Sequence, residues 1–276
     1  MRRAFAEEVA KPDEKIRLEY AALLIAAEDE AHLKVDIAEC LLRLERWAAS
    51  AREYVAQSHA GTPIEIFNRF IFDELGLAGN QLDYYDPRNS YLNEVIDRRT
   101  GIPITLAIVY IEVGRRVGLN VEGVGLPGHF IVRVCGRDSI ASALVDPFHG
   151  KTLDLNDCQE RLDEVYGGQV TLEEDEHLRG ATTREILVRL LTNLKAIYAR
   201  ANLYRHALAS VERILLLTPY AADEHRDRGA LLAQLDRLTE AIAETEAYLR
   251  LAPNAPEAEQ AREQLKALQR QQATRN

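Results

Sequence analysis

The sequence predicts an α+β domain followed by an all-helical segment, and three features predict this fold class. Residues 103–116, PITLAIVYIEVGRR, form an apolar stretch of helical length. Three short segments rich in β-branched and aromatic residues follow it, at 121–126, 129–134 and 142–147. Beyond about residue 180 the pattern is helical only and repeats along the chain. A sheet packed on one buried helix gives an α+β domain, and regular helical repetition gives stacked helix pairs.

Length and composition limit the classes of protein that the chain can belong to. A chain of 276 residues exceeds what one core usually organises, and we predict domains at 1–180 and 181–276. With 47% hydrophobic and 28% charged residues, and no apolar run near the roughly 18 residues that cross a bilayer, it is expected to be soluble. The net charge of −10, without a stripe of Lys and Arg, argues against binding nucleic acid.

Cysteine usage and the first residues predict a cytoplasmic protein. Cys40, Cys135 and Cys158 are an odd number of thiols without metal-ligand spacing, which is typical of a reducing compartment. Cys40 falls on an apolar helix face and is expected to be a buried structural thiol. The start, MRRAFAEEVAKPDEK, is basic but has no apolar stretch behind it, so no secretory signal is predicted.

The first hundred residues are predicted to be helical. Residues 14–57 contain two segments with apolar residues near helical spacing, and Asp36 is placed to cap the second. A third helix is predicted at 63–76, where it ends at a glycine, and a short one at 90–100. The polar loop LAGNQLDYYDPRNS separates these two.

The apolar stretch at 103–116 is predicted to be the central helix of the domain. Proline suits the first turn because the N–H that it lacks would be unpaired there anyway, and Pro103 takes that place. The helix is apolar on nearly every face up to Glu112, which predicts that protein surrounds it. Glu112 is expected to pair with Arg115 or Arg116 or to accept backbone hydrogen bonds, and Gly118 can supply the left-handed turn that ends the helix.

His129 and Asp146 are the residues most suggestive of catalysis. If 129–134 and 142–147 form a hairpin that turns at Arg137 and Asp138, these two side chains lie opposite each other, about 5 Å apart at Cβ. A carboxylate in that position holds an imidazole in one tautomer and stabilises its protonated form. The alternative is a polar pair that only joins two strands.

The order of these residues resembles the transglutaminase-like branch of the papain-type fold. The chain has Gly101-Ile102-Pro103 at the helix start, His129 at the first strand and Asp146-Pro147 at the end of the next. The resemblance implies a catalytic cysteine at the helix start, a histidine on the following strand and an aspartate on the next. Two of these roles carry over, but Pro103 takes the position of the cysteine, and proline has no group that can attack a carbonyl.

No other residue is a convincing replacement for the cysteine. Thr105 lies two residues into the helix, and its hydroxyl would need a well-placed base. At about 3.3 Å per residue, Cys135 is roughly 20 Å along the strand from His129. Cys158 lies beyond the motif. We therefore lean towards a protein that is not an enzyme.

Some residues near the pair are candidates to line a cleft, and each has a structural alternative. The candidates are Asn89, Tyr91, Pro103, Thr105 and Gly128. A glycine beside a histidine lets a ligand approach closely, whereas Asp-Pro followed by Asn-Ser is also ordinary turn and cap chemistry. His149 is expected to be an exposed loop residue. No set of His, Cys and carboxylates has ligand spacing, so neither a metal nor a cofactor is predicted.

The C-terminal segment resembles the tetratricopeptide repeat. An offset of 34 aligns Tyr198 with Leu232, Ala207 with Ala241, Leu208 with Ile242, Leu217 with Leu251 and Pro219 with Pro253. The resemblance covers residues 190–255, and Arg228 is a poor fit to an apolar position. Thr182 and Glu185 form a capping-box pattern ahead of it. Two repeats and a final polar helix are few for a free-standing array, so we expect docking on the α+β domain.

The motifs DPRNSYLN, GIPITL, VGLPGHF and DPF, joined to this segment, narrow the resemblance. Over residues 15–255 the chain is similar to the bacterial family known as regulators of sirC expression, with transglutaminase-like and tetratricopeptide domains. The resemblance implies a two-domain protein whose core has lost its cysteine, and the family name reports a genetic association with the regulation of gene expression rather than a mechanism. We expect it to bind a protein or peptide through its cleft or its repeats.

The alternative is an amide-bond hydrolase or acyl transferase that uses His129 and Asp146 with an unidentified nucleophile. A transcription factor acting on DNA would need a basic recognition element, which the sequence lacks.

Overall fold

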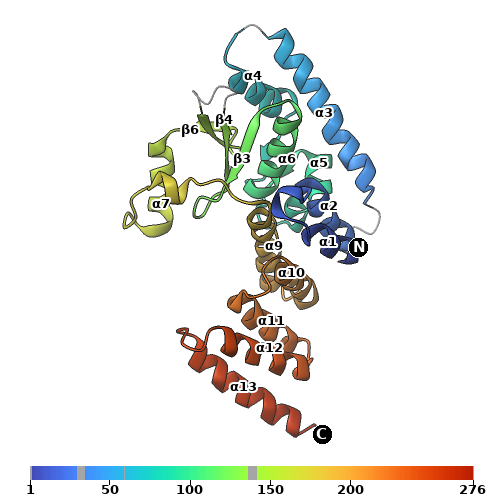
Figure 1. The fold of residues 1–276 in the computed structure, drawn as a ribbon, viewed down its shortest axis with the longest axis vertical. Coiled ribbons are helices and arrows are strands. Elements are labelled where there is room, and N and C mark those ends of the chain that lie inside the picture. Colours follow the sequence, from blue (N-terminus) through green and yellow to red (C-terminus); the bar gives the residue numbers. More distant parts are fainter. Residues whose placement is uncertain (1, 30–34, 59, 136–141, 276) are drawn as a thin grey trace. The chain divides into compact units, whose positions relative to one another are not determined.

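The computed structural model describes residues 2–29, 35–58, 60–135 and 142–275 (Figure 1). The chain divides into two compact units, Met1–Leu187 and Val188–Asn276. The first unit mixes helices and sheet, and the second contains only helices in its described part, which confirms the predicted fold class. Helix α9 (Thr183–Arg200) begins in the first unit and ends in the second, so the division lies a little after the boundary predicted between residues 180 and 181.

Helices dominate the first hundred residues of the first unit. They are α1 (Arg2–Val9), α2 (Leu18–Glu28), α3 (Ile37–Gln57), α4 (Pro63–Arg69) and α5 (Leu92–Arg98), with short turns η1 (Asp13–Lys15), η3 (Phe70–Glu74) and η4 (Pro87–Ser90). The side chain of Asp36 accepts the Glu39 N–H at 3.0 Å and so caps α3, as predicted. The sequence did not predict α1, which buries few of its residues.

Helix α6 (Pro103–Arg116) is the central helix, and every residue from Ile104 to Gly114 is buried. It packs against α2, α3, α5 and the sheet (Figure 1). Pro103 is its first helical residue. At its other end Gly118 has φ +88°, and the Leu119 N–H reaches the Gly114 carbonyl at 3.0 Å. The local signals for this helix are therefore confirmed.

An antiparallel sheet of order β3-β4-β5-β6 packs on α6. Its strands are β3 (Asn120–Val124), β4 (Ile131–Cys135), β5 (Ser142–Asp146) and β6 (Lys151–Leu153). A second, parallel pair joins β1 (Ala78–Gly79) to β2 (Thr100–Gly101), immediately before α6. Three of the four strands of the larger sheet follow the prediction, whereas β6 is too short to have been recognised.

The pairing of β4 with β5 differs from the predicted register. Val132 pairs with Val145 and Cys135 with Ser142, so the same register places Asp146 opposite Ile131 rather than His129. The predicted register was therefore wrong by two residues, because it was inferred from an assumed position of the turn, and such a shift changes every facing pair along both strands. The turn that it placed at Arg137 and Asp138 lies outside the described residues.

The two faces of the sheet carry different helices. Val121 contacts α6, where a Cβ added to Gly114 would come within 2.7 Å of its side chain. The other face is covered by α7 (Leu155–Tyr166), whose start is capped by Asp154. The core on that side consists of Val124, Leu126, Ile131, Leu153, Cys158, Leu162 and Leu178. Because Asp146 follows Val145, which shares the face of Val132, it points to the face that α7 covers. A short helix, α8 (Glu174–His177), follows α7.

The second unit repeats with the predicted period. Helices α10 (Tyr204–Leu217) and α12 (Leu238–Leu251) begin and end 34 residues apart, with α11 (Ala222–Gln234) between them. The tight turns match as well, since Asn202 and Asp236 are left-handed, with φ of 58° and 60°. The predicted capping box also forms, with Thr182 and Glu185 bonding each other's N–H.

Helix α13 (Ala258–Ala273) ends the second unit, as the sequence predicted. Its buried residues are Ala258, Ala261 and Leu268, and most of its other side chains are polar. A helix with a narrow apolar stripe and a polar outer face is suited to close a repeat stack. The docking of the repeats on the α+β domain stays a prediction.

Candidate functional site

The start of α6, where the resemblance implies a catalytic cysteine, holds Pro103 and a fully buried Thr105. The Thr105 hydroxyl lies 2.7 Å from the Asn89 carbonyl, to which it donates, and accepts the Ile102 N–H at 3.2 Å. The Thr105 hydroxyl thus both donates to and accepts from backbone groups. This geometry favours a structural role for Thr105 over that of a nucleophile.

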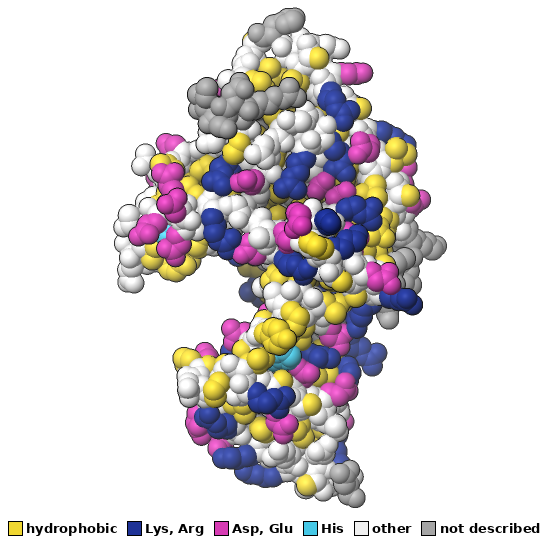
Figure 2. Space-filling view, viewed as in Figure 1, with side chains coloured by type: hydrophobic (Ala, Val, Ile, Leu, Met, Phe, Trp, Pro, Cys, Tyr) yellow, Lys and Arg dark blue, Asp and Glu magenta, His cyan; other side chains and the backbone are white. Residues whose placement is uncertain are grey.

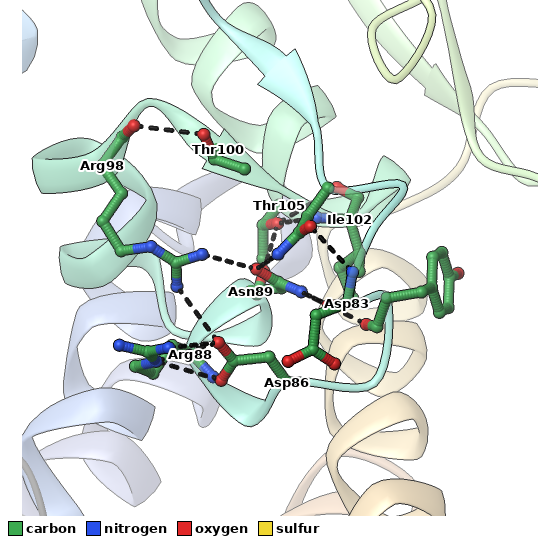
Figure 3. A network of polar contacts seen from close by, with 10 residues as sticks. Asp83, Asp86, Arg88, Asn89, Arg98, Thr100, Ile102 and Thr105 are labelled. Carbon is green, nitrogen blue, oxygen red and sulfur yellow. Dashed lines mark hydrogen bonds and ion pairs between the residues drawn. The ribbon is translucent and has the colours of Figure 1, made fainter.

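Asn89 is the centre of a buried network that fixes the loop before α6 (Figure 3). Its Nδ2 donates to the carbonyls of Asp83 at 2.7 Å and Tyr84 at 3.3 Å. Its Oδ1 accepts from Asn80 Nδ2 at 3.1 Å and from Arg98 Nη2 at 2.9 Å. The amide nitrogen and the amide oxygen of Asn89 each have two hydrogen-bond partners, and the side chain is buried. Asn89 therefore holds the loop rather than lining a cleft.

The other cleft candidates divide into a buried residue and two at the surface. Tyr91 is 3% exposed and donates its hydroxyl to Asp29 Oδ2 at 2.5 Å, linking α5 to the end of α2. Pro103 is half-buried and Gly128 is exposed. Gly128 has φ +74°, and a Cβ there would lie 2.6 Å from Val165 of α7. The glycine is therefore needed for close packing of α7 and for its own backbone conformation.

Asp146 is buried and accepts four hydrogen bonds. Its Oδ1 takes the N–H groups of Phe148 at 2.9 Å and His149 at 3.2 Å. Its Oδ2 lies 2.7 Å from His149 Nδ1 and 2.7 Å from Arg161 Nη2. Burial raises the pKa of Asp146, but the hydrogen bonds from His149 and Arg161 outweigh it and leave that pKa below its usual value. The carboxylate is therefore ionised at neutral pH.

His149 has the place beside Asp146 that the sequence assigned to His129. It was expected to be an exposed loop residue, and its side chain is 37% exposed but bonded to the carboxylate. The signal that could have found it is local, because an aspartate at the start of a turn often bonds residues two and three further on. Arg161 lies on α7, a helix that the sequence did not reveal, and so was not predicted either.

His129 precedes β4 and faces α7 instead. Its Nε2 lies 3.6 Å from Glu164 Oε2, and its side chain is 26% exposed. Burial and the positive charge of Arg161 lower the pKa of His129, and the nearby Asp146 and Glu164 offset them only in part. The imidazole is therefore neutral at pH 7, and it lacks the close carboxylate of an oriented catalytic base.

The described residues of the chain contain no group of three or more His, Cys, Asp and Glu that could hold a metal ion. In the same part of the chain no helix has the length and apolar character to cross a membrane. On the face seen in Figure 2, acidic and basic side chains are intermixed over both units. Among the described residues we take the contact between His149 and Asp146 as the candidate site.

Ion pairs in the second unit replace part of the apolar contact expected between repeats. Arg228 lies 2.9 Å from Glu244 and 3.7 Å from Glu212. Lys195 lies 2.7 Å from Glu224 and 2.8 Å from Asp227. Arg228 stands where the repeat pattern expects an apolar residue, and its ion pairs with Glu212 of α10 and Glu244 of α12 explain why a charged side chain is tolerated there.

Comparison with known proteins identifies both parts of the chain. The transglutaminase-like superfamily matches residues 38–192, and the tetratricopeptide repeat matches residues 194–266. A UPF0162 protein of Xylella fastidiosa (strain 9a5c) is 39% identical over 246 residues, 88% of this chain and 86% of that protein. A UPF0162 protein of Vibrio cholerae is 29% identical over 206 residues, 74% of this chain and 75% of that one. Human F-box only protein 21 is 30% identical over 153 residues, 50% of this chain and 22% of that protein. The chain therefore belongs to the transglutaminase-like superfamily, within the family of the UPF0162 proteins.

Proposed function

We propose that the protein acts through protein–protein interaction and that its transglutaminase-like core does not use cysteine chemistry. The observation that carries this proposal is Pro103 as the first residue of α6, where the family resemblance implies the nucleophile. The backbone contacts of the Thr105 hydroxyl add support, because they engage the nearest hydroxyl on the same helix.

The second unit offers the surface for such an interaction. Tetratricopeptide repeats generally bind helices or extended peptides. Large apolar side chains are exposed on this unit, namely Leu203 (45%), Leu216 (40%), Tyr220 (83%) and Leu251 (41%). A partner that is a protein or peptide accounts for such side chains better than a small polar ligand does.

The setting that we propose is regulatory and cytoplasmic. The resemblance to regulators of sirC expression supports a role in controlling gene expression through another protein, without direct contact to nucleic acid. The thiols support a reducing compartment, because Cys40, Cys135 and Cys158 are all unpaired.

Affinity purification with chemical crosslinking tests this proposal on the full-length chain. The double variant Tyr220→Ser/Leu216→Ser removes exposed apolar side chains from the second unit. The matched control Tyr166→Ser/Leu155→Ser removes exposed side chains of similar size from α7 of the first unit, which are 43% and 46% exposed. We expect one partner to crosslink to wild type and to the control and to be lost with the first variant. Equal recovery with all three chains, or no stoichiometric partner with any, contradicts the proposal.

A second function, acyl chemistry without the cysteine, is favoured by the contact between His149 and Asp146. An imidazole held by a buried carboxylate is the arrangement that an amide-bond hydrolase or acyl transferase needs in its base. In the form that the sequence suggested, His129 was that base. The 2.7 Å contact of His149 Nδ1 with Asp146 favours His149 instead.

A further inference from the structure

We infer that His149 and Asp146 form a general-base site that promotes attack of water on carboxylic esters. The inference rests on the second function proposed above, acyl chemistry without the cysteine. It adds the identity of the base, the nucleophile and the class of substrate.

The carboxylate is held in a way that orients the histidine. Asp146 is 3% exposed at its side chain, and its Oδ2 is shared between His149 Nδ1 and Arg161 Nη2, both at 2.7 Å. The N–H groups of Phe148 and His149 hold the other oxygen. Because Asp146 is ionised and acts only as an acceptor, Nδ1 of His149 carries the hydrogen. In the neutral form of the ring Nε2 then carries the lone pair, as a general base requires.

The histidine is also accessible, which the carboxylate is not. The His149 side chain is 37% exposed, so water and a small ester can approach its ring. His129 is less suitable, because its Nε2 faces the Glu164 carboxylate at 3.6 Å and the oxygens of Asp146 have other partners. The two histidines thus differ in which ring nitrogen lies beside a carboxylate, Nδ1 in His149 and Nε2 in His129.

Aromatic side chains beside the histidine favour a substrate with an apolar group. The Phe148 ring packs edge-on to the imidazole at 5.0 Å, and Tyr84 packs on Phe148 at 5.9 Å. Gly150, with φ +66°, turns the chain so that Phe72 lies beside it. The Gly79 N–H donates to the Phe148 carbonyl at 3.1 Å and ties this turn to β1. An ester with an aromatic or short aliphatic group can therefore rest against fixed rings.

Water is the nucleophile in the reaction, since Pro103 and the engaged Thr105 offer none. Nε2 takes a proton from water while the oxygen of that water bonds to the ester carbonyl carbon. The tetrahedral adduct then breaks its carbon–oxygen bond to the leaving group, which departs with the electron pair and receives the proton from the imidazolium. The products are one carboxylic acid and one alcohol, and the imidazole is restored. Esters suit this route better than amides because an alkoxide or phenolate leaves more easily than the anion of an amine.

Hydrolysis of p-nitrophenyl acetate by the full-length chain tests the inference. We expect His149→Gln to lower the catalysed rate at least about tenfold, in line with the loss of a general base. Asp146→Asn should lower it as well, because the amide no longer fixes the tautomer. His177→Gln, a histidine on α8 outside this site, should leave the rate unchanged. Added imidazole should restore activity to His149→Ala, and the wild-type rate should fall in D2O, neither of which a purely structural histidine would produce.

The possible failures are distinguishable. If His149→Gln matches wild type while His129→Gln loses the activity, acyl chemistry stands and the assignment to His149 is overturned. If His177→Gln loses as much as His149→Gln, the hydrolysis belongs to surface histidines in general and the site is refuted. If wild type is no faster than buffer, both the inference and the acyl function fail. Circular dichroism of His149→Gln separates loss of the base from loss of the fold.

Discussion

At the scale of single residues, Glu112 shows how burial and a shared partner set the charge of a side chain. It lies inside α6, where Arg116 Nη1 donates to its carboxylate at 2.5 Å. Arg116 also binds Glu45 at 2.7 Å and Glu19 at 3.1 Å. Burial, with the negative charge of Glu19, raises the pKa of Glu112 to about 7. The sequence predicted the pairing with an arginine but not the acidic residues from α2 and α3, because only the fold brings them together.

The raised pKa of Glu112 predicts a pH dependence of stability. Because the folded pKa lies above the unfolded value near 4.5, the folded chain holds a proton that the unfolded chain releases between about pH 4.5 and 7. Stability from this group is therefore present at low pH and is lost as pH rises to about 7. In the wild type this group lowers the free energy of unfolding as pH rises, and Glu112→Gln should remove roughly 1–3 kcal/mol of that decrease, measured by urea unfolding from pH 5 to 8. Glu263→Gln, at the exposed pair with Lys266, is the control and should keep the wild-type slope.

Asn89 is the residue whose loss should most disturb the loop before α6. Its side chain satisfies two carbonyls and accepts from Asn80 and Arg98 in a fully buried place. Asn89→Ala leaves these groups unpaired and should lower the free energy of unfolding by about 2–4 kcal/mol. Asn156→Ala, at an exposed position of α7, should change it by less than about 0.5 kcal/mol. Equal effects in denaturant unfolding would contradict the role given to Asn89.

At the scale of elements, the sequence predicted what local chemistry decides. Pro103 and Gly118 mark the ends of α6, and Asp36 marks the start of α3, because each acts on residues a turn away. The pairing of β4 with β5 depends instead on where the connection between them turns. An error of two residues there placed Asp146 opposite His129 in the prediction, whereas the register of the structure places it opposite Ile131. Helix α7 was missed because its apolar stripe is narrow, with only Cys158 and Leu162 buried. The contact of Asp146 with Arg161 could not be foreseen without it.

The start of α9 is held by a carboxylate from far away in the sequence. Asp13 accepts the N–H groups of Thr183 and Arg184, both at 2.9 Å. It therefore acts as a helix cap supplied by another segment of the first unit. Asp13→Ala should lower the free energy of unfolding by about 1 kcal/mol in thermal or denaturant melts. The neighbouring exposed Glu14→Ala is the control, and a loss as large in that variant would show that net charge rather than capping is responsible.

At the scale of the whole molecule, the two units differ in how far apart their contacts lie in the sequence. In the first unit, Asn89 joins the loop to α6, and Asp13 joins the N-terminal segment to α9. Contacts between residues so far apart leave no periodic pattern in the sequence. The same holds for the contact of Asp146 with Arg161, so the site around Asp146 could be predicted only in part. In the second unit α10, α11, α12 and α13 pack in the order of the sequence, and the same turn returns at Asn202 and Asp236. That regularity is why the repeat was recognised from its period alone.

This difference predicts that damage to a repeat turn stays within the second unit. Asn202 and Asp236 have left-handed backbones that asparagine and aspartate tolerate and β-branched residues do not. Asn202→Val and Asp236→Val should each cost about 1–2 kcal/mol, and their effects should add if the two turns are energetically independent. Hydrogen exchange read by mass spectrometry should rise in peptides from residues 188–276 and stay at the wild-type level in residues 2–187. Asn202→Gly, which removes the strain but also the side chain, should keep wild-type exchange in both units. Faster exchange throughout the chain in the valine variants would mean that the two units unfold as one, and that the period seen in the sequence does not mark an independent unit of stability.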